Sequence, residues 1–325
     1  MSRDRAPVDE DKILRLTIVC AATLFLACFT PSAQAHTAGG HSVLTDWHWR
    51  WDVGSILLFF GTLYVLGWLR LRKMGGQAKL DQLIFYAVAL GAIGCALLSP
   101  IDDLASYLLI AHMVQHELLM MVAPPLLLLA NPVPVLLWGL GGSSRLQAGN
   151  LLGPHAVIRR MREFLGRMPV AWSLYVVNLW AWHHPVLYQA ALDDPWIHDI
   201  EHILFFLTAL VFWWPIMNPI SRAAPIQYGV RILYLFFAAT QDTVLSGLIA
   251  LSREVLYPHY ETALRLWDLT PREDQIGGGL VMFGVGSLTY LVAILVLVNN
   301  LLGKEGRRST KRALGNGAEK VKDRI

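Results

Sequence analysis

Two pairs of histidines lie in apolar stretches of the sequence, and the members of each pair are four residues apart. They are His112 with His116, and His198 with His202. On an α-helix this spacing places both imidazoles on one face, about 6 Å apart. Ionisable side chains at membrane depth are costly and are as a rule functional. We therefore interpret the two pairs first as a metal site.

The elements that must position these histidines are membrane-spanning helices. The chain of 325 residues is 55% hydrophobic and 16% charged, whereas soluble proteins carry about 25% charged residues. The apolar residues fall in runs of about 18 to 22, the length of a helix that crosses the hydrocarbon core. The composition therefore predicts an all-α, polytopic integral membrane protein that lies in the lipid bilayer. We expect it to bind no nucleic acid.

Seven spans are predicted after an N-terminal signal peptide. Residues 1–35 have basic residues, then an apolar stretch, then Ala-Gln-Ala at 33–35, as secretory signals do. An uncleaved first transmembrane helix is the alternative. The seven-helix membrane domain is expected at 36–303, before a basic tail at 304–325. The spans are 53–71, 80–98, 104–129, 170–192, 197–217, 230–251 and 276–302.

The charges in the loops predict the orientation. Most Lys and Arg residues follow spans one, three and five or lie in the tail, whereas paired aspartates follow spans two and four. By the positive-inside rule, the N-terminus lies outside and the C-terminus in the cytoplasm, as in a bacterial-type plasma membrane. The apolar stretch 133–140 is too short to span, and we predict that it lies at the inner interface.

Further candidate ligands share the predicted outer half of the bilayer. Four of the predicted spans place a histidine or a methionine there, and a random scatter would not favour one leaflet. Imidazole suits zinc, copper, iron and nickel, and thioether sulfur selects Cu(I), so the methionines favour copper. The candidates beyond the two pairs are His183, His184, Met120 and Met282.

Three carboxylates accompany the histidines. Glu117 and Glu201 adjoin the two pairs, where they could orient a ligand imidazole or relay protons. Asp242 lies near the middle of the sixth span and must face the bundle interior. A buried hydrogen bond and a proton or ion path would each explain it.

Other functions fit parts of this pattern. The histidines could form hydrogen bonds between helices without a metal, a bis-histidine haem site or the centre of a seven-span zinc hydrolase. Residues 198–202 match the H-x-x-E-H pattern of zinc proteases, but without the soluble catalytic domain of those enzymes. A copper or proton transporter would need a polar path to the inner side. The three cysteines form no C-x-x-C pair, which excludes a thioredoxin-like motif and a cysteine clamp.

Several short motifs are spread along the sequence from residue 112 to residue 282. They are 112–116 followed by 121–126, Trp182-His-His-Pro185 with Tyr188, Pro195 and 198–202, Phe212-Trp-Trp-Pro215, and 274–282. Together they resemble the CtaG-type cytochrome c oxidase assembly factors, the multi-span kind associated with caa-type oxidases. These differ from the single-span copper chaperones that share the name. The resemblance covers about residues 45–300.

The resemblance implies a seven-helix membrane protein, not an enzyme, that matures the oxidase by handling copper for its copper centres. The implied metal is copper as Cu(I), with zinc and haem as alternatives. The implied partners are oxidase subunits or other copper chaperones. The implied copper ligands are His112, His116, His184, His198, His202 and Met282, with His183 as the alternative to His184.

Overall fold

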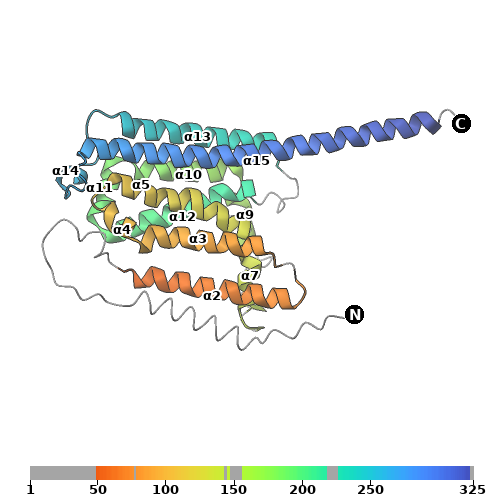
Figure 1. Cartoon of the computed structure of the whole chain (residues 1–325), viewed down its shortest axis with the longest axis horizontal. Helices are drawn as coiled ribbons and strands as arrows, with labels where there is room; N and C mark the ends of the chain where they lie inside the picture. The colour runs from red at the N-terminus through yellow and green to blue at the C-terminus, as the bar shows by residue number, and fades with distance from the viewer. Residues whose placement is uncertain (1–48, 77, 143–144, 147–155, 218–225, 323–325) are drawn as a thin grey trace. The chain divides into compact units, whose positions relative to one another are not determined.

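The computed structural model describes residues 49–76, 78–142, 145–146, 156–217 and 226–322. The described residues form helices and no strand (Figure 1), which confirms the all-α prediction. The predicted signal peptide and its cleavage motif lie outside the described residues.

Among the described residues, six helical segments are long and apolar enough to cross a membrane. Large apolar side chains on them are exposed, for example Phe236 at 55% and Leu291 at 53%, as expected of a surface that contacts lipid. The segments are α2 (Trp51–Lys73), α3 (Leu80–Leu98), the run of α5 (Leu109–Glu117), η1 (Leu118–Val122) and α6 (Ala123–Ala130), α12 (Pro195–Met217), α13 (Tyr228–Leu251), and α15 (Pro271–Lys322) as far as Gly303.

Shorter helices connect these segments. The stretch 133–140, predicted to lie at the inner interface, forms most of the short helix α7. That it lies on the inner side of the membrane stays a prediction. The shorter helices are α4 (Pro100–Ala105), α7 (Pro132–Gly139), α9 (Ala156–Leu165), α10 (Met168–Trp182), α11 (Pro185–Asp193) and α14 (His259–Thr262).

The predicted fourth span, 170–192, is not one continuous helix. α10 ends at Trp182 and α11 begins at Pro185. His184 between them is extended, with ψ 129°, because a following proline disfavours the helical region. The prediction of seven continuous spans is therefore not confirmed, and the break places two histidines between two short helices.

The predicted third span, 104–129, also differs from expectation. α4 and the extended residue Leu108 precede it, so α5 begins only at residue 109. Pro124 and Pro125 do not end it. The π-helical η1 ends at Val122 and α6 begins at Ala123, so both prolines lie in the first turn of α6. In the first turn of a helix the missing N–H of proline costs little.

Three glycines let α15 pack closely against α5 and α13. A Cβ on Gly279 would lie 2.8 Å from the Cβ of Ala250, and one on Gly278 would lie 2.9 Å from Cγ of Leu109. The small residues at 277–279 thus permit a close approach of the helices.

Both histidine pairs lie near one end of the bundle. α2, α5, α12 and α15 begin there, and α3, α10 and α13 end there. Figure 1 shows this end on the left, beside α11 and α14. We call it the histidine end.

The contact between α2 and α7 yields a first prediction. A Cβ on Gly67 would overlap the carbonyl oxygen of Val135, and a backbone atom cannot rotate away. We expect Gly67→Ala to destabilise the protein by about 1–3 kcal/mol through overpacking. Gly91→Ala is the matched control, because no atom lies within 4 Å of its Cβ. Equal thermal unfolding midpoints of the two variants in detergent would contradict the packing described.

Candidate metal centre

The two histidine pairs lie at matching positions on α5 and α12. His112 and His198 are the fourth residues of these helices, and His116 and His202 are the eighth. At about 1.5 Å per residue, both pairs extend from about 4.5 to 10.5 Å along their helices. The ring centroids of His112 and His198 are 5.1 Å apart, and those of His116 and His202 are 5.4 Å apart. The four rings therefore form one histidine cluster.

Of the two neighbouring histidines after α10, His183 joins this cluster and His184 does not. The ring of His183 is buried, and its centroid lies 6.0 Å from that of His116. His184 is exposed, and its Nδ1 accepts a hydrogen bond from the N–H of Val186, which caps α11. We therefore replace His184 by His183 in the candidate ligand set.

Glu201 places a carboxylate between the histidines. Its Oε2 lies 3.8 Å from Nε2 of His112, and its Oε1 lies 3.7 Å from Nε2 of His116. These distances are too long for hydrogen bonds. They are close to the separation of about 3.4 Å expected between two ligand atoms of a tetrahedral ion bound at 2.0–2.1 Å. Glu201 is thus positioned as a candidate ligand itself, and not only as a residue that orients one.

Two overlapping groups of residues are compact enough to hold an ion. In each group the candidate donor atoms lie within 4.8 Å of one another. Both groups contain His112, so one continuous set of donors surrounds its ring. The groups are His112, His198 and His202, and His112, His116 and Glu201.

Tyr260 determines which ring nitrogen of His112 carries the proton and which one is free to bind a metal. Burial raises the pKa of the Tyr260 hydroxyl well above its usual value of 10, so the hydroxyl keeps its one proton. It donates that proton to the carbonyl oxygen of Ala105, 2.9 Å away. Nδ1 of His112, 3.1 Å from the same hydroxyl, must then be the donor. The lone pair of His112 is therefore on Nε2, which faces Glu201.

The other donor atoms of the cluster lack hydrogen-bond partners within the described part of the chain. Nδ1 of His183 donates to the carbonyl of Leu179 at 2.8 Å, which leaves Nε2 as the acceptor. Each unsatisfied buried polar group costs about 1–3 kcal/mol, so this arrangement argues against a purely hydrogen-bonded histidine network. The unpartnered atoms are Nε2 of His112, His183 and His198, both ring nitrogens of His116 and His202, and both carboxylate oxygens of Glu201.

The packing of the rings favours a small ion over a haem. A bis-histidine haem would be held by one imidazole from each helix, on opposite faces of a flat macrocycle. The cross-helix ring centroids are 5.1 Å apart for His112 and His198, and 5.4 Å apart for His116 and His202. Rings packed this closely, with Glu201 beside them, suit a small ion better than a flat macrocycle.

The predicted ligand Met282 lies on α15, which packs against α5. Asp274 accepts a hydrogen bond from the N–H of Leu109 at 2.7 Å, and Gly278 packs against the same leucine. Met282 is one turn further along α15 and buried, which places it level with residues 113–117. Its role as a ligand stays a prediction, as does that of Met120, which is buried in η1.

Glu117 and Asp242 form a second buried group, which we call the acidic pair. They are 5% and 2% exposed, and Oε2 of Glu117 and Oδ1 of Asp242 have no hydrogen-bond partner among the described residues. Gly286 makes room for this pair, because a Cβ there would overlap Oδ2 of Asp242. The prediction that Asp242 faces the bundle interior is confirmed.

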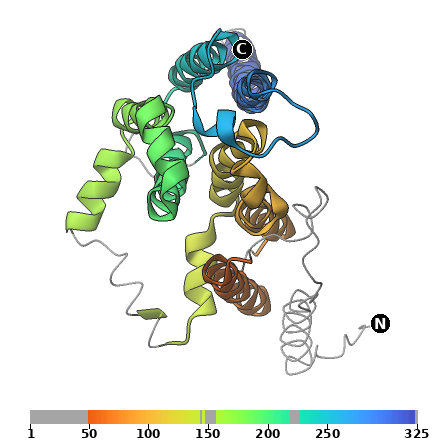
Figure 2. The same cartoon turned by 90° about the vertical axis from the view of Figure 1, so that its left-hand side faces the viewer.

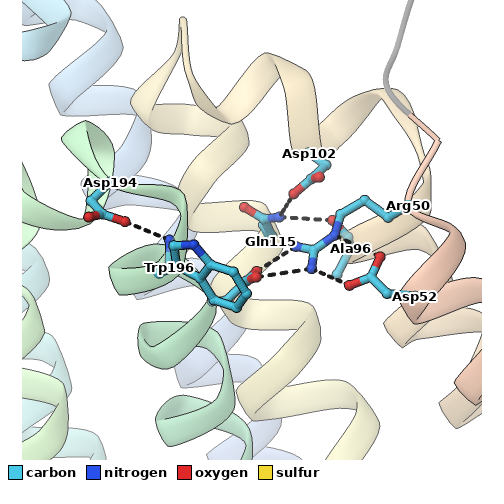
Figure 3. A network of polar contacts seen from close by, with 8 residues as sticks. Arg50, Asp52, Ala96, Asp102, Gln115, Asp194 and Trp196 are labelled. Carbon is cyan, nitrogen blue, oxygen red and sulfur yellow. Dashed lines mark hydrogen bonds and ion pairs between the residues drawn. The ribbon is translucent and has the colours of Figure 1, made fainter.

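An ion pair closes the histidine end beside the cluster (Figure 3). Arg50 lies 2.5 Å from Oδ1 of Asp199 and 2.7 Å from Oδ2 of Asp52. Because Asp199 follows His198, this pair ties the start of α2 to the first turn of α12.

The side-chain amide of Gln115 forms a second set of polar contacts nearby, to α3 and α4. The side-chain amide of Gln115 donates to Asp102 at 2.6 Å and to the carbonyl of Ala96 at 3.0 Å (Figure 3). Gln115 lies between the two histidines of α5, so these bonds fix the rotation of the helix that carries them.

The fold and the site define a class: a helical membrane protein with a buried centre of histidines and one glutamate. A family model for the cytochrome c oxidase caa3 assembly factor (Caa3_CtaG) matches residues 62–304. The chain belongs to this family. The motifs from residue 112 to residue 282 all lie within the match, which confirms the resemblance found in the sequence.

The curated relatives are distant and longer. An uncharacterized protein of Mycobacterium leprae is 23% identical over 265 residues, which cover 77% of this chain and 39% of that relative. An uncharacterized protein of Mycobacterium bovis is 25% identical over 260 residues, with 79% and 39% covered. The chain thus spans about two fifths of the length of these relatives. No solved structure matches the chain significantly.

The network around Gln115 yields a prediction on pH. Burial raises the pKa of Asp102 to about 6 from its usual 3.8, so the folded chain binds this proton more tightly than the unfolded chain. As pH rises from about 4 to about 6, the contribution of Asp102 to the free energy of unfolding therefore falls by up to about 3 kcal/mol. Above about pH 6 this contribution is constant. We expect Asp102→Asn to remove this part of the pH dependence of thermal unfolding in detergent. Parallel curves for variant and wild type would contradict the assignment.

Proposed function

We propose that this assembly factor binds copper at the histidine centre and hands it on during maturation of the copper centres of the oxidase. The observation that carries the proposal is the convergence of buried, unpartnered imidazole nitrogens on Glu201. Copper is the cargo here, so the role of the protein is capture and transfer and not catalysis.

The chemistry of the donors supports copper. Imidazole suits copper, zinc, iron and nickel, and thioether sulfur selects Cu(I). The donors that converge in the structure are imidazoles and one carboxylate, which zinc also accepts. Membership of the oxidase assembly family supports copper over zinc, because cytochrome c oxidase contains copper centres.

The proposed location follows from the charges in the loops. With the N-terminus outside a bacterial-type plasma membrane, the histidine end faces outward, because α5, α12 and α15 begin there. Copper would then be taken up from the outer side and delivered to an oxidase subunit or another copper chaperone on that side.

Transport of copper across the membrane is the second candidate function. It is favoured by the acidic pair, which offers polar groups deeper in the bundle than the cluster. Toward the opposite end, however, Arg231 is buried in α13, and a fixed cation opposes the passage of Cu(I). Uptake into vesicles would establish transport.

The first test of the proposal is metal content after loading with Cu(I) in mild detergent. We expect near-stoichiometric copper in the wild type and loss of at least tenfold in occupancy in the variant with His112→Ala and His116→Ala. A single His183→Ala variant should weaken binding, whereas its neighbour His184→Ala should not. The proposal would be refuted if the protein held zinc in place of copper, or if the wild type and all variants had equal metal contents.

A second test addresses the hydroxyl that orients His112. Tyr260→Phe removes the acceptor of the Nδ1 proton while keeping the ring. We expect the affinity for copper to fall about 10–100-fold, as is typical when such an orienting partner is lost. Tyr64→Phe is the control, because its hydroxyl bonds to the carbonyl of Ala130, far from the cluster. A competition titration with a Cu(I) chelator measures both, and unchanged affinity in Tyr260→Phe would refute the role.

A further inference from the structure

A deep apolar groove runs beside the histidine cluster. Residues of α2, α3 and α7 line one side of it, and residues of α9 and α12 line the other. Figure 2 shows the helices α2 and α7 set apart from α9 and α12. Its walls are almost wholly apolar and include Ile56, Phe60, Val133 and Ile203, which are 41–56% exposed.

The dimensions of the groove fit an α-helix. It follows α12 from Asp199 to Trp214, which is about 22 Å at 1.5 Å per residue. Its volume of about 1140 Å³ over that length gives a cross-section of about 50 Å², against about 80 Å² for a helix about 10 Å across with side chains. A helix in the groove would thus be mostly enclosed and would keep one side in contact with lipid.

One residue of the histidine cluster forms part of the wall. His202 lines the groove, and both of its ring nitrogens lack a hydrogen-bond partner in the described part of the chain. Whatever occupies the groove therefore lies beside the centre at which we place the metal.

The end of the groove near the histidines is polar and carries net negative charge. Arg50, Asp52 and Asp199 line it, so two carboxylates face one guanidinium. His202 is three residues beyond Asp199, about one helical turn deeper. A chain entering here would meet the carboxylates first and the metal centre one turn below.

We propose that this groove receives one transmembrane helix of the protein that accepts the metal. The inference rests on the proposed function and names the partner by its chemistry. That helix is apolar over about 22 Å, has a basic residue at its outer end to pair with the aspartates, and carries a metal-binding side chain about one turn below.

Neighbouring phenylalanines on α2 provide the test. Phe60 lines the groove and Phe59 does not, although both are exposed. Each would be replaced in turn by the photo-crosslinking residue p-benzoylphenylalanine in the full chain, in membranes that also contain a caa-type oxidase. We expect crosslinks from position 60 to a transmembrane helix of an oxidase subunit, identified by mass spectrometry of the linked peptide, at least tenfold above those from position 59.

A second measurement separates this proposal from the metal site itself. Ile56→Trp would place an indole ring in the groove, and Phe59→Trp places the same ring outside it. We expect Ile56→Trp to lower the copper content of the assembled oxidase about tenfold, while the purified variant still binds copper as the wild type does. Phe59→Trp should change neither quantity.

The proposal is overturned by equal crosslinking from both positions, or by crosslinks from position 60 to lipid, to a second copy or to another part of this chain only. Unchanged oxidase copper in Ile56→Trp would overturn it as well. If the wild type bound no copper, the proposed function would fail, and the crosslinking result would still decide whether the groove holds a partner helix.

Discussion

Buried ring nitrogens without hydrogen-bond partners raise the free energy of a folded chain, and this protein gathers several of them around the carboxylate of Glu201. A bound cation would satisfy one nitrogen of each ligating imidazole together with the carboxylate of Glu201, which pairwise hydrogen bonds do not do at distances of 3.7–3.8 Å. Much of the surrounding structure keeps this arrangement in place. Tyr260 fixes the tautomer of His112, Gln115 fixes the rotation of α5, and the pairing of Arg50 with Asp199 fixes the first turn of α12.

The sequence predicted the helical membrane fold and the two histidine pairs, because both depend on local periodicity. It did not predict the break at Pro185, where one proline outweighs a long apolar run. The choice of His184 over His183 followed from the family resemblance alone. The partners of the cluster were missed because they are far apart in the chain: Tyr260 is 148 residues from His112, and Asp199 is 149 residues from Arg50.

The membrane gives this centre a property that a soluble metal site lacks. Lipid surrounds the bundle, so under the proposed function an acceptor protein could approach the centre from the side as well as from the water. The break between α10 and α11 supplies His183 at the histidine end, while the groove along α12 runs beside the buried ring of His202. Capture and release would then use two different approaches to one set of ligands, which suits an assembly factor that must give up what it binds.

The proposed function requires that imidazoles from α5, α12 and the α10–α11 break converge on one copper ion. X-ray absorption at the copper edge of the Cu(I)-loaded, detergent-solubilised protein measures this convergence, because imidazole rings give characteristic outer-shell scattering. We expect nitrogen or oxygen donors at about 2 Å with scattering from at least two imidazoles. A spectrum without imidazole scattering, or with sulfur donors alone, would rule out such a centre.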